Sequence, residues 1–302
     1  MSARKWQNGI IISILATFTT WWLFIAVFVP ESLMHRQLWS GTYGLAALFG
    51  AVAGLINFKA WGGMKSVVGK SMVMFSLGLF CQEFGQVIFS YYAFFVHIDV
   101  PYPSLADVGY FSALPLYIYG AYLLNKWIKS LEPAKHRSGN GATVVSLCLL
   151  VFFIISIPIF FHGFNTGNMS LNKALFSYIY LLSDTLFVLL AVKAYFLSRQ
   201  IPLDNINKPV FIFVLALCFQ YLADYTFFAQ VSYGTWIAAG LNDLLYFTAY
   251  CFMAIGLVHI RVLVEATERV TGFNKMQQYF VTSFFQCLRK LRLLVWRYGK
   301  QW

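Results

Sequence analysis

The chain has 302 residues, of which 60% are hydrophobic and only 11% are charged. A soluble domain has roughly 45–50% apolar and about 25% charged residues, so this composition excludes a water-soluble globular enzyme and indicates a polytopic membrane protein. Lysine and arginine number 22 against 11 aspartates and glutamates, which gives a net charge of +11. The five cysteines are scattered through apolar stretches and form no disulfide or zinc pattern.

Eight apolar stretches are each long enough to cross a bilayer, which takes about 20 residues in a helix. The first is longer than the roughly 7–15-residue core of a signal peptide and lacks a small-residue cleavage motif, so we expect it to be retained. The sequence predicts an all-α integral membrane protein with eight transmembrane helices. They span residues 8–29, 38–57, 67–96, 106–125, 142–162, 172–195, 208–229 and 236–260.

The distribution of basic residues predicts the orientation of these helices. If the N-terminus is cytoplasmic, only Arg36 and Lys173 of the 22 lysines and arginines lie outside. The positive-inside rule then predicts a multi-pass protein of the cytoplasmic (inner) membrane with both termini in the cytoplasm. The basic residues are spread over every inner segment, as an anionic leaflet favours, which argues against nucleic acid as a partner.

The two halves of the apolar region resemble each other. A shift of about 137 residues places Leu77, Leu79, Gln82 and Phe89 on Leu215, Leu217, Gln220 and Phe227. After two positions of drift, Asp107 to Ala113 falls on Asp243 to Ala249, and Gly120 falls on Gly256. Four spans in each half give both halves the same orientation, so we predict two parallel four-helix repeats, residues 1–130 and 131–262. The alternative is that these matches arise by chance, because Phe and Leu are common throughout this sequence.

The last segment, residues 263–302, differs from the spans. From about Thr271, apolar residues recur three and four positions apart, while basic residues crowd the end. This pattern predicts a cytoplasmic linker followed by a basic amphipathic helix in the inner interface. Its partners would be a membrane or cytoplasmic protein, and anionic inner-leaflet lipids that it contacts through Arg289, Lys290, Arg292 and Arg297.

Polar side chains within the spans are the candidates for a site. A carboxylate at the bilayer centre costs roughly 2.5–3.5 kcal/mol and therefore usually faces a polar interior. Gln82 and Gln86 share one helix face, Gln220 and Asp224 share another, and the two pairs correspond under the repeat. We predict an outward-facing polar cavity, with helix-to-helix hydrogen bonds without any ligand, or a proton path, as alternatives. The candidate ligand-binding residues are Gln82, Glu83, Gln86, Asp184, Gln220, Asp224 and Asp243.

Ser104 and Asp107 have a structural explanation as well as a binding one. They follow the turn-forming segment Pro101-Tyr-Pro103 and have the capping-box pattern that begins a helix. Asp243 also stands near the predicted start of a helix, but Gly240 replaces the capping hydroxyl there. We therefore expect Asp107 to cap a helix, and Asp243 has the weaker structural explanation.

The sequence predicts neither a metal site nor a catalytic centre, and it identifies no cofactor. His35, His97 and His162 all fall on the predicted outer face, but not at the spacings of zinc or copper sites. Lys70 and Lys193 lie only at cytoplasmic ends of spans, which argues against a retinal Schiff base. No span pairs a nucleophile with a histidine or carries a recognisable acid dyad.

One motif resembles a known class of membrane domain. Its residues are Pro101-Tyr-Pro103-Ser104-Leu-Ala-Asp107-Val-Gly-Tyr110, and Asn242-Asp243-Leu-Leu-Tyr246 repeats part of it. The motif is similar to the P-S-x-A-D-x-x-[YF] element of the multi-span input domains that precede bacterial diguanylate cyclases and histidine kinases. The resemblance would extend over residues 8–262 and implies a membrane-embedded sensory domain. After Thr271 the chain has neither a cyclase Gly-Gly-Asp/Glu-Glu-Phe loop nor a kinase region, so the expected domain lacks an output module.

These observations lead to one leading hypothesis and two alternatives. The leading hypothesis is a non-enzymatic sensor or ligand-binding module, which signals through a partner or through the basic tail. A small-solute or proton-coupled transporter is the first alternative, because acids at a repeat interface are also typical of transporters. A scaffold subunit of a larger membrane complex is the second.

Overall fold

The computed structural model describes residues 3–58, 62–96, 100, 104–131, 143–151, 153–154, 157, 171–201 and 206–260. Within these ranges the chain is all-helical and contains no β-strand. Six helices of this described part are long and apolar enough to cross a membrane, so the fold is that of a multi-pass membrane protein. They are Trp6–Phe28, Leu33–Asn57, Val67–Val96, Leu175–Ser198, Asn207–Tyr233 and Leu241–Ile260.

The labelled helices follow the predicted spans in order, with different ends. The helix Leu241–Ile260 carries no label, and we call it the central helix. A π-helical turn, Tyr91–Val96, extends the helix Val67–Ser90. The labelled helices are α1 (Ala3–Phe28), α2 (Leu33–Thr42), α3 (Leu45–Asn57), α4 (Val67–Ser90), α5 (Leu105–Lys129), α7 (Leu171–Ser198) and α8 (Asn207–Tyr233).

Two predicted spans differ from the structure in their detail. The span 38–57 falls within the helix Leu33–Asn57, but this helix is interrupted by a turn at Tyr43 and Gly44, where α2 ends at Thr42 and α3 begins at Leu45. The break contains Gly44, where a Cβ atom would collide with the carboxylate of Glu83 on α4. The span 142–162 is described only at 143–151, 153–154 and 157, and all of these residues are helical. The predicted tail, 263–302, lies outside the described residues.

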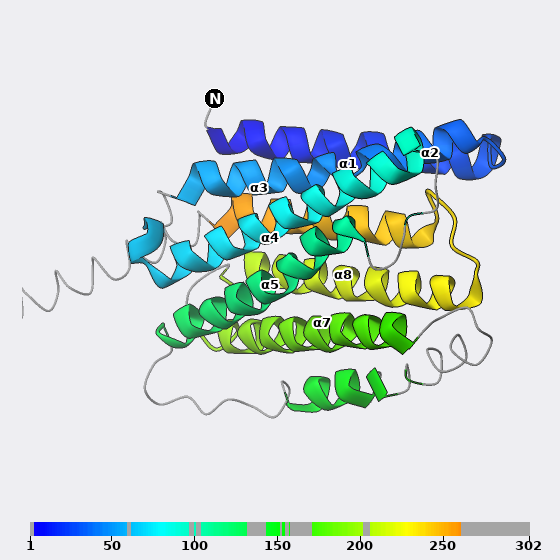
Figure 1. Ribbon diagram of the computed structural model, residues 1–302. Coiled ribbons are helices and arrows are strands. Elements are labelled where there is room, and N and C mark those ends of the chain that lie inside the picture. The colour runs from blue at the N-terminus through cyan, green and yellow to red at the C-terminus, as the bar shows by residue number, and fades with distance from the viewer. Residues whose placement is uncertain are drawn as a thin grey trace, which may run out of the picture. The chain divides into compact units, whose positions relative to one another are not determined.

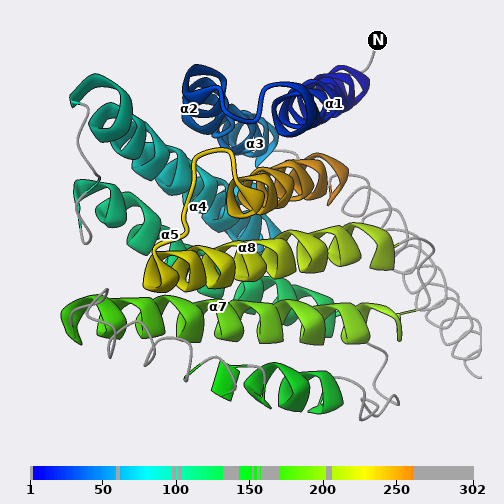
Figure 2. The same cartoon turned by 90° about the vertical axis from the view of Figure 1, so that its right-hand side faces the viewer.

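The helices pack side by side, with the central helix enclosed among them. α4 packs between α3 and α5, and α7 packs between α5 and α8 (Figure 1). The central helix lies between α1 and α3 on one side and α8 on the other (Figure 2). On the first side, the ring of Phe247 stacks on Phe18 of α1 with their centroids 5.3 Å apart. On the other, Tyr246 donates a hydrogen bond to Asp224 of α8. The central helix therefore contacts α1, near the start of the chain, and α8, which precedes it in sequence.

α4 and α5 approach each other closely where both contain glycine. A Cβ atom at Gly109 would lie 2.6 Å from the backbone nitrogen of Gly85 and 2.7 Å from the carbonyl oxygen of Cys81. Small residues permit this kind of backbone contact between membrane helices. The contact matters for the site, because it brings Gln86, next to Gly85, against Tyr110, next to Gly109.

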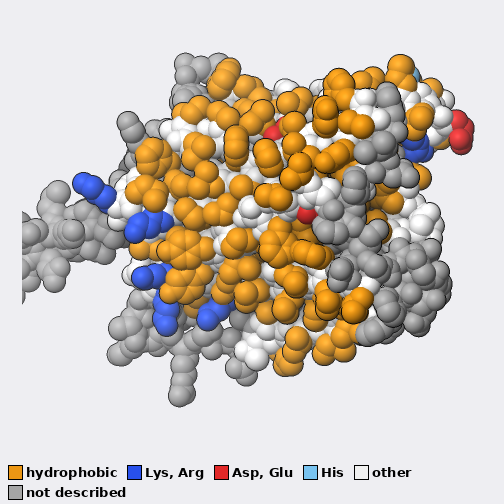
Figure 3. Space-filling model, viewed as in Figure 1, with side chains coloured by type: hydrophobic (Ala, Val, Ile, Leu, Met, Phe, Trp, Pro, Cys, Tyr) orange, Lys and Arg blue, Asp and Glu red, His pale blue; other side chains and the backbone are white. Residues whose placement is uncertain are grey.

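Charged residues divide the bundle into two unlike ends. Apolar side chains cover the middle of the face seen in Figure 3, while most of the lysine and arginine side chains in view gather at one end and basic surface beside an acidic side chain lies at the other. The exposed basic residues of the described chain lie at the starts of α4 and α8 and toward the ends of α5 and α7. They are Lys65, Lys70, Lys126, Lys129, Lys193, Arg199 and Lys208.

Candidate functional site

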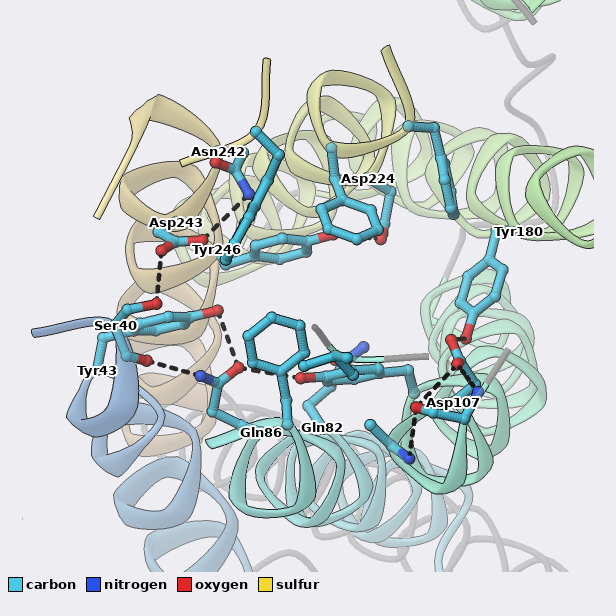
Figure 4. Close-up of a pocket in the computed structure, with 18 of the residues that line it drawn as sticks. Ser40, Tyr43, Gln82, Gln86, Asp107, Tyr180, Asp224, Asn242, Asp243 and Tyr246 are labelled. Atoms are coloured by element: carbon cyan, nitrogen blue, oxygen red, sulfur yellow. Dashed lines mark hydrogen bonds between the residues drawn. The ribbon is translucent and has the colours of Figure 1, made fainter. Parts of the chain in front are cut away.

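A cavity of about 90 Å³ lies among α2, α4, α5, α7, α8 and the central helix (Figure 4). Because a water molecule needs only roughly 10–15 Å³ of such space, the cavity has room for several waters or a small ligand. Its walls come from the C-terminal parts of α4 and α8 and from the first turns of α5 and the central helix. These are the helix ends opposite the basic ones. The walls hold five tyrosines, three aspartates and four other aromatic residues: Tyr43, Tyr110, Tyr180, Tyr246, Tyr250; Asp107, Asp224, Asp243; Phe89, Phe227, Phe228 and Trp236.

Gln86 joins three segments of the cavity wall. Its Oε1 atom accepts hydrogen bonds from the hydroxyls of Tyr43, at 3.1 Å, and Tyr110, at 3.0 Å. Its Nε2 group donates to the backbone carbonyl of Ser40 at 2.7 Å. The Gln86 side chain is 4% exposed. One buried amide thus ties α4 to α5 and to the break between α2 and α3.

Asp224 and Gln82 accept hydrogen bonds from tyrosine hydroxyl groups of the central helix. Tyr246 donates to Oδ1 of Asp224 at 2.7 Å, and Tyr250 donates to Oε1 of Gln82 at 3.2 Å. From behind the wall, Gln220 donates its Nε2 group to Oδ2 of Asp224 at 2.9 Å. These bonds fix the central helix against α8 on one side and α4 on the other.

Asp107 caps the first turn of α5 while it lines the cavity. Its Oδ2 atom accepts the backbone N–H of Ser104 at 2.6 Å, and the Ser104 hydroxyl accepts the N–H of Ala106 at 3.2 Å. Both halves of a capping box are present. The hydroxyl of Tyr180 on α7 donates to the other oxygen, Oδ1, at 3.4 Å. Capping and a place in the cavity wall are therefore compatible.

Asp243 is also held at the start of its helix, by donors that the sequence pattern does not indicate. Its Oδ2 atom accepts the Ser40 hydroxyl and the backbone N–H of Ala239, each at 2.8 Å. Its Oδ1 atom accepts the amide of Asn242 at 3.1 Å. The loop that supplies Ala239 is fixed in turn, because Trp22 of α1 donates to the Ala239 carbonyl at 3.0 Å.

Six of the nine candidate residues line the cavity: Gln82, Gln86, Ser104, Asp107, Asp224 and Asp243. The other three lie outside its lining. Gln220 supports Asp224 from behind. Asp184 on α7 is completely buried, and its carboxyl group interacts with that of Asp224. Glu83 is half-buried and points to Gly44 at the α2–α3 break, where its Oε2 atom has no hydrogen-bond partner among the described residues.

The tyrosines of the wall are the functional residues that sequence reasoning missed. Composition and spacing assign these tyrosines no role of their own, because tyrosine is also enriched at membrane interfaces. A signal was present, because Ser40 and Tyr43 recur 137 residues later as Ser177 and Tyr180. Tyr43 and Tyr180 both line the cavity.

The charge of the cavity wall is one-sided. The described lining residues include three aspartates and no lysine, arginine or histidine. Within the described ranges, no three acidic, histidine or cysteine side chains group closely enough to hold a metal ion. Comparison with protein-family models, curated proteins and solved structures gives no match to this chain. The function is therefore inferred from the geometry of the cavity.

Proposed function

We propose that this protein is a non-enzymatic, membrane-embedded ligand-binding protein of the sensory class. The observation that carries the proposal is the cavity, because a mostly aromatic hollow with a few converging polar groups is the usual form of a small-molecule site. The polar groups are also fixed in advance. Tyr43, Tyr110, Tyr246 and Tyr250 each bond to a neighbouring wall residue, so little side-chain ordering remains to be done on binding.

The proposed topology has eight spans, both termini in the cytoplasm and the cavity open toward the outside of the inner membrane. Six helices meet the criteria for a span by themselves. α5 has 25 residues, which at about 1.5 Å per residue is long enough to cross hydrocarbon roughly 30 Å thick. Residues 142–162 supply the eighth. The exposed basic residues gather at the end opposite the cavity, and of the described basic side chains only the partly buried Arg36 lies near the cavity. This distribution supports an outward-facing site under the positive-inside rule.

The proposed architecture is a parallel repeat of two four-helix halves. Matched contacts support it. Tyr110 bonds to Gln86 as Tyr246 bonds to Asp224, and these residues correspond under the sequence repeat. A second pair of contacts behaves likewise. A Cβ at Gly120 would meet the ring of Phe75 at 3.3 Å, and one at Gly256 would meet the ring of Phe213 at 3.1 Å. The rings of Phe75 and Phe213 stack on each other, 5.0 Å apart.

If the halves are equivalent, Gly120→Ala and Gly256→Ala will lower thermal stability by similar amounts. Each new methyl group presses on one phenylalanine ring, for which overpacking of about 1–3 kcal/mol is the usual cost. The measurement is the temperature at which half of the purified protein still elutes as a monodisperse species after heating. A harmless change at one glycine together with unfolding at the other would contradict the repeat.

The central helix is the proposed route of the signal. Asp243, Tyr246 and Tyr250 face the ligand cavity near its beginning, and the chain runs on from Ile260 into the basic tail. A ligand that shifts the beginning of a rigid helix also shifts its end. The tail would report the shift through anionic inner-leaflet lipids, bound by Arg289, Lys290, Arg292 and Arg297, or through a protein partner. The resemblance of the Ser104–Tyr110 segment to bacterial input domains supports this sensory role.

Transport is the second candidate, and a specific observation favours it. Asp184 lies buried behind Asp224, so acidic groups continue from the cavity into the bundle. Buried acids in series are typical of proton relays in transporters. Uptake into proteoliposomes separates the two functions, because a sensor binds its ligand without accumulating it and a transporter accumulates it.

We expect a cavity-narrowing substitution to abolish ligand binding while a matched one does not. Phe89 lines the cavity and packs edge-on against Trp236, with ring centroids 5.7 Å apart. Phe89→Trp enlarges this wall residue, whereas Phe80→Trp makes the same change at a 51%-exposed position of the same helix. Native mass spectrometry in nanodiscs, with thermal-shift screening of metabolites, measures binding. A small molecule retained by wild type and by Phe80→Trp but lost from Phe89→Trp is the expected result. Binding unaffected by Phe89→Trp, or no binding to any of the three, would refute the proposal.

A further inference from the structure

The charge of the cavity indicates the class of its ligand. Asp107, Asp224 and Asp243 face the hollow from three sides (Figure 4). No basic side chain stands among the described lining residues to balance them. Because buried charges are stabilised by partners of opposite sign, an anionic ligand is disfavoured and a cationic one is favoured. The aspartates lie apart rather than around one point, and the described chain has no cluster suited to a metal ion. A cation with an organic body fits this spacing.

The hydrogen-bonding groups of the wall point to the same class. Four tyrosine hydroxyls of the wall each donate their single hydrogen to a glutamine or aspartate oxygen. They belong to Tyr43, Tyr110, Tyr246 and Tyr250. A hydroxyl that has donated its hydrogen keeps lone pairs that accept. The hydroxyl and carboxylate groups of the wall therefore offer acceptors to a ligand, beside the amide N–H groups of Gln82, Gln86 and Asn242. An ammonium group that carries N–H donors satisfies such a surface, and a quaternary ammonium group does not.

Asp224 is the aspartate with most capacity to bind an ammonium group. Asp107 and Asp243 each accept three hydrogen bonds from their own helix starts and neighbouring helices. Asp224 accepts two, from Gln220 and Tyr246. The carboxyl group of Asp184 lies behind it and interacts with it. Of the three aspartates, Asp224 therefore accepts the fewest hydrogen bonds from other residues and has the most room for the N–H donors of a ligand.

The apolar part of the wall suits the body of such a ligand. Phe227 and Phe228 follow Asp224 on α8, and Phe89 and Trp236 pack on each other in the same wall. Aromatic faces attract cations, by about 0.5–2 kcal/mol, as well as burying apolar surface. The indole N–H of Trp236 is buried without an acceptor among the described residues, so it remains available to an acceptor atom of a ligand or to water.

We infer that the cavity binds a small protonated amine, with its ammonium group at Asp224 and Tyr246 and its apolar body among Phe89, Phe227 and Trp236. This inference rests on the proposed ligand-binding function and names the chemical class of the ligand. A primary or secondary amine with an aromatic or short aliphatic body matches the aspartates, the accepting hydroxyls and the aromatic side chains of the wall, and the Trp236 N–H is left to water.

The test uses four probes of one shape with the full chain in nanodiscs. They are phenethylamine, its N,N,N-trimethyl derivative, 2-phenylethanol and phenylacetate, and calorimetry measures their dissociation constants. We expect phenethylamine to bind at least about tenfold more tightly than each of the other three, because charge-assisted hydrogen bonds are roughly twice as strong as neutral ones. Equal or tighter binding of the alcohol or the acid would overturn the inference. Equal binding of the trimethyl derivative would overturn the role given to the wall acceptors. Binding of calcium or sodium without any binding of the amine would also overturn the inference that the ligand is an amine.

Two acid-to-amide variants locate the ammonium group. Asp224→Asn is expected to weaken phenethylamine binding at least about tenfold, since the amide keeps the shape but loses the charge. Glu83→Gln makes the same chemical change on α4 outside the cavity and should leave the affinity unchanged. Equal affinities of Asp224→Asn and wild type would overturn the assignment. If no amine binds while wild type still retains another small molecule that Phe89→Trp loses, the ligand class is wrong and the binding function stands. If nothing binds in either experiment, both fail.

Discussion

Gly109→Ala is expected to cause the largest loss of stability of any single methyl addition in the described chain. The added Cβ would lie 2.6–2.9 Å from backbone atoms of Gly85 and Cys81. Backbone atoms of a helix cannot rotate away as the end of a side chain can, so α4 and α5 must move apart. Overpacking usually costs about 1–3 kcal/mol, and a contact with backbone belongs at or above the upper end. Separation of these helices would also break the Gln86–Tyr110 hydrogen bond, and ligand binding should fall with stability.

Gly9→Ala is the matched control for this prediction. Gly9 is an exposed residue of α1, and a Cβ there would meet no atom within 4 Å. Alanine is a better helix former than glycine by up to about 1 kcal/mol, so this variant should be as stable as wild type or slightly more so. Monodispersity after heating, measured in one detergent for all three proteins, gives the comparison. Equal stability of the two variants would mean that α4 and α5 do not cross at Gly85 and Gly109.

Helix content and order could be predicted from the sequence, because the free energy of inserting a helix into a bilayer depends mainly on the residue composition of that segment. The break between α2 and α3 could not. A hydropathy average treats Gly44 as one more small apolar residue. Its role comes from Glu83 on a different helix, whose carboxylate occupies the place that a side chain at Gly44 would need. Contacts between segments that are far apart in sequence decide such details.

The site was predictable to the extent that helix periodicity determines which residues share a face. Gln82 and Gln86, four residues apart, both line the cavity. Glu83 follows Gln82 by one residue and is therefore rotated by about 100° around the helix, which takes it out of the wall. The cost of a carboxylate in lipid indicates that such a residue needs a polar or buried environment, but not which one. Asp184 and Glu83 satisfy that need outside the cavity, Asp184 in the bundle interior and Glu83 at the α2–α3 break.

The tyrosines and Asp243 were harder to assign, because their roles depend on partners in other helices. Asp243 has no serine before it, and its capping donors include Ser40, which lies 203 positions away. Tyrosine is common both at membrane interfaces and in polar interiors, so its presence in a span does not distinguish the two. The sequence match that aligns Tyr110 with Tyr246 is the informative signal, since both hydroxyls donate to polar residues of the cavity wall.

Gln86→Leu is expected to have the largest effect on the cavity itself. The leucine side chain fills a similar volume but removes three hydrogen bonds, from Tyr43, from Tyr110 and to the Ser40 carbonyl. At an average of about 0.6 kcal/mol for each bond between membrane helices, the direct loss is roughly 2 kcal/mol. Hydroxyl groups left without a partner in a buried wall add to this, at about 1–3 kcal/mol each where no water replaces the bond. The wall should therefore loosen where α2, α4 and α5 meet.

A set of variants distinguishes loss of this hydrogen-bonded junction from general damage to α4. Val87→Leu changes the next residue, which is 55% exposed, and should behave as wild type. Tyr110→Phe removes one of the three bonds and should cost about a third as much as Gln86→Leu. Because both changes remove the Gln86–Tyr110 bond, the double variant should be less destabilised than the sum of the two single variants. Strict additivity, or a Gln86→Leu protein as stable as Val87→Leu, would show that packing rather than Gln86 holds the wall together. The hydrogen bonds of Gln86 would then not be what fixes the polar groups for ligand binding.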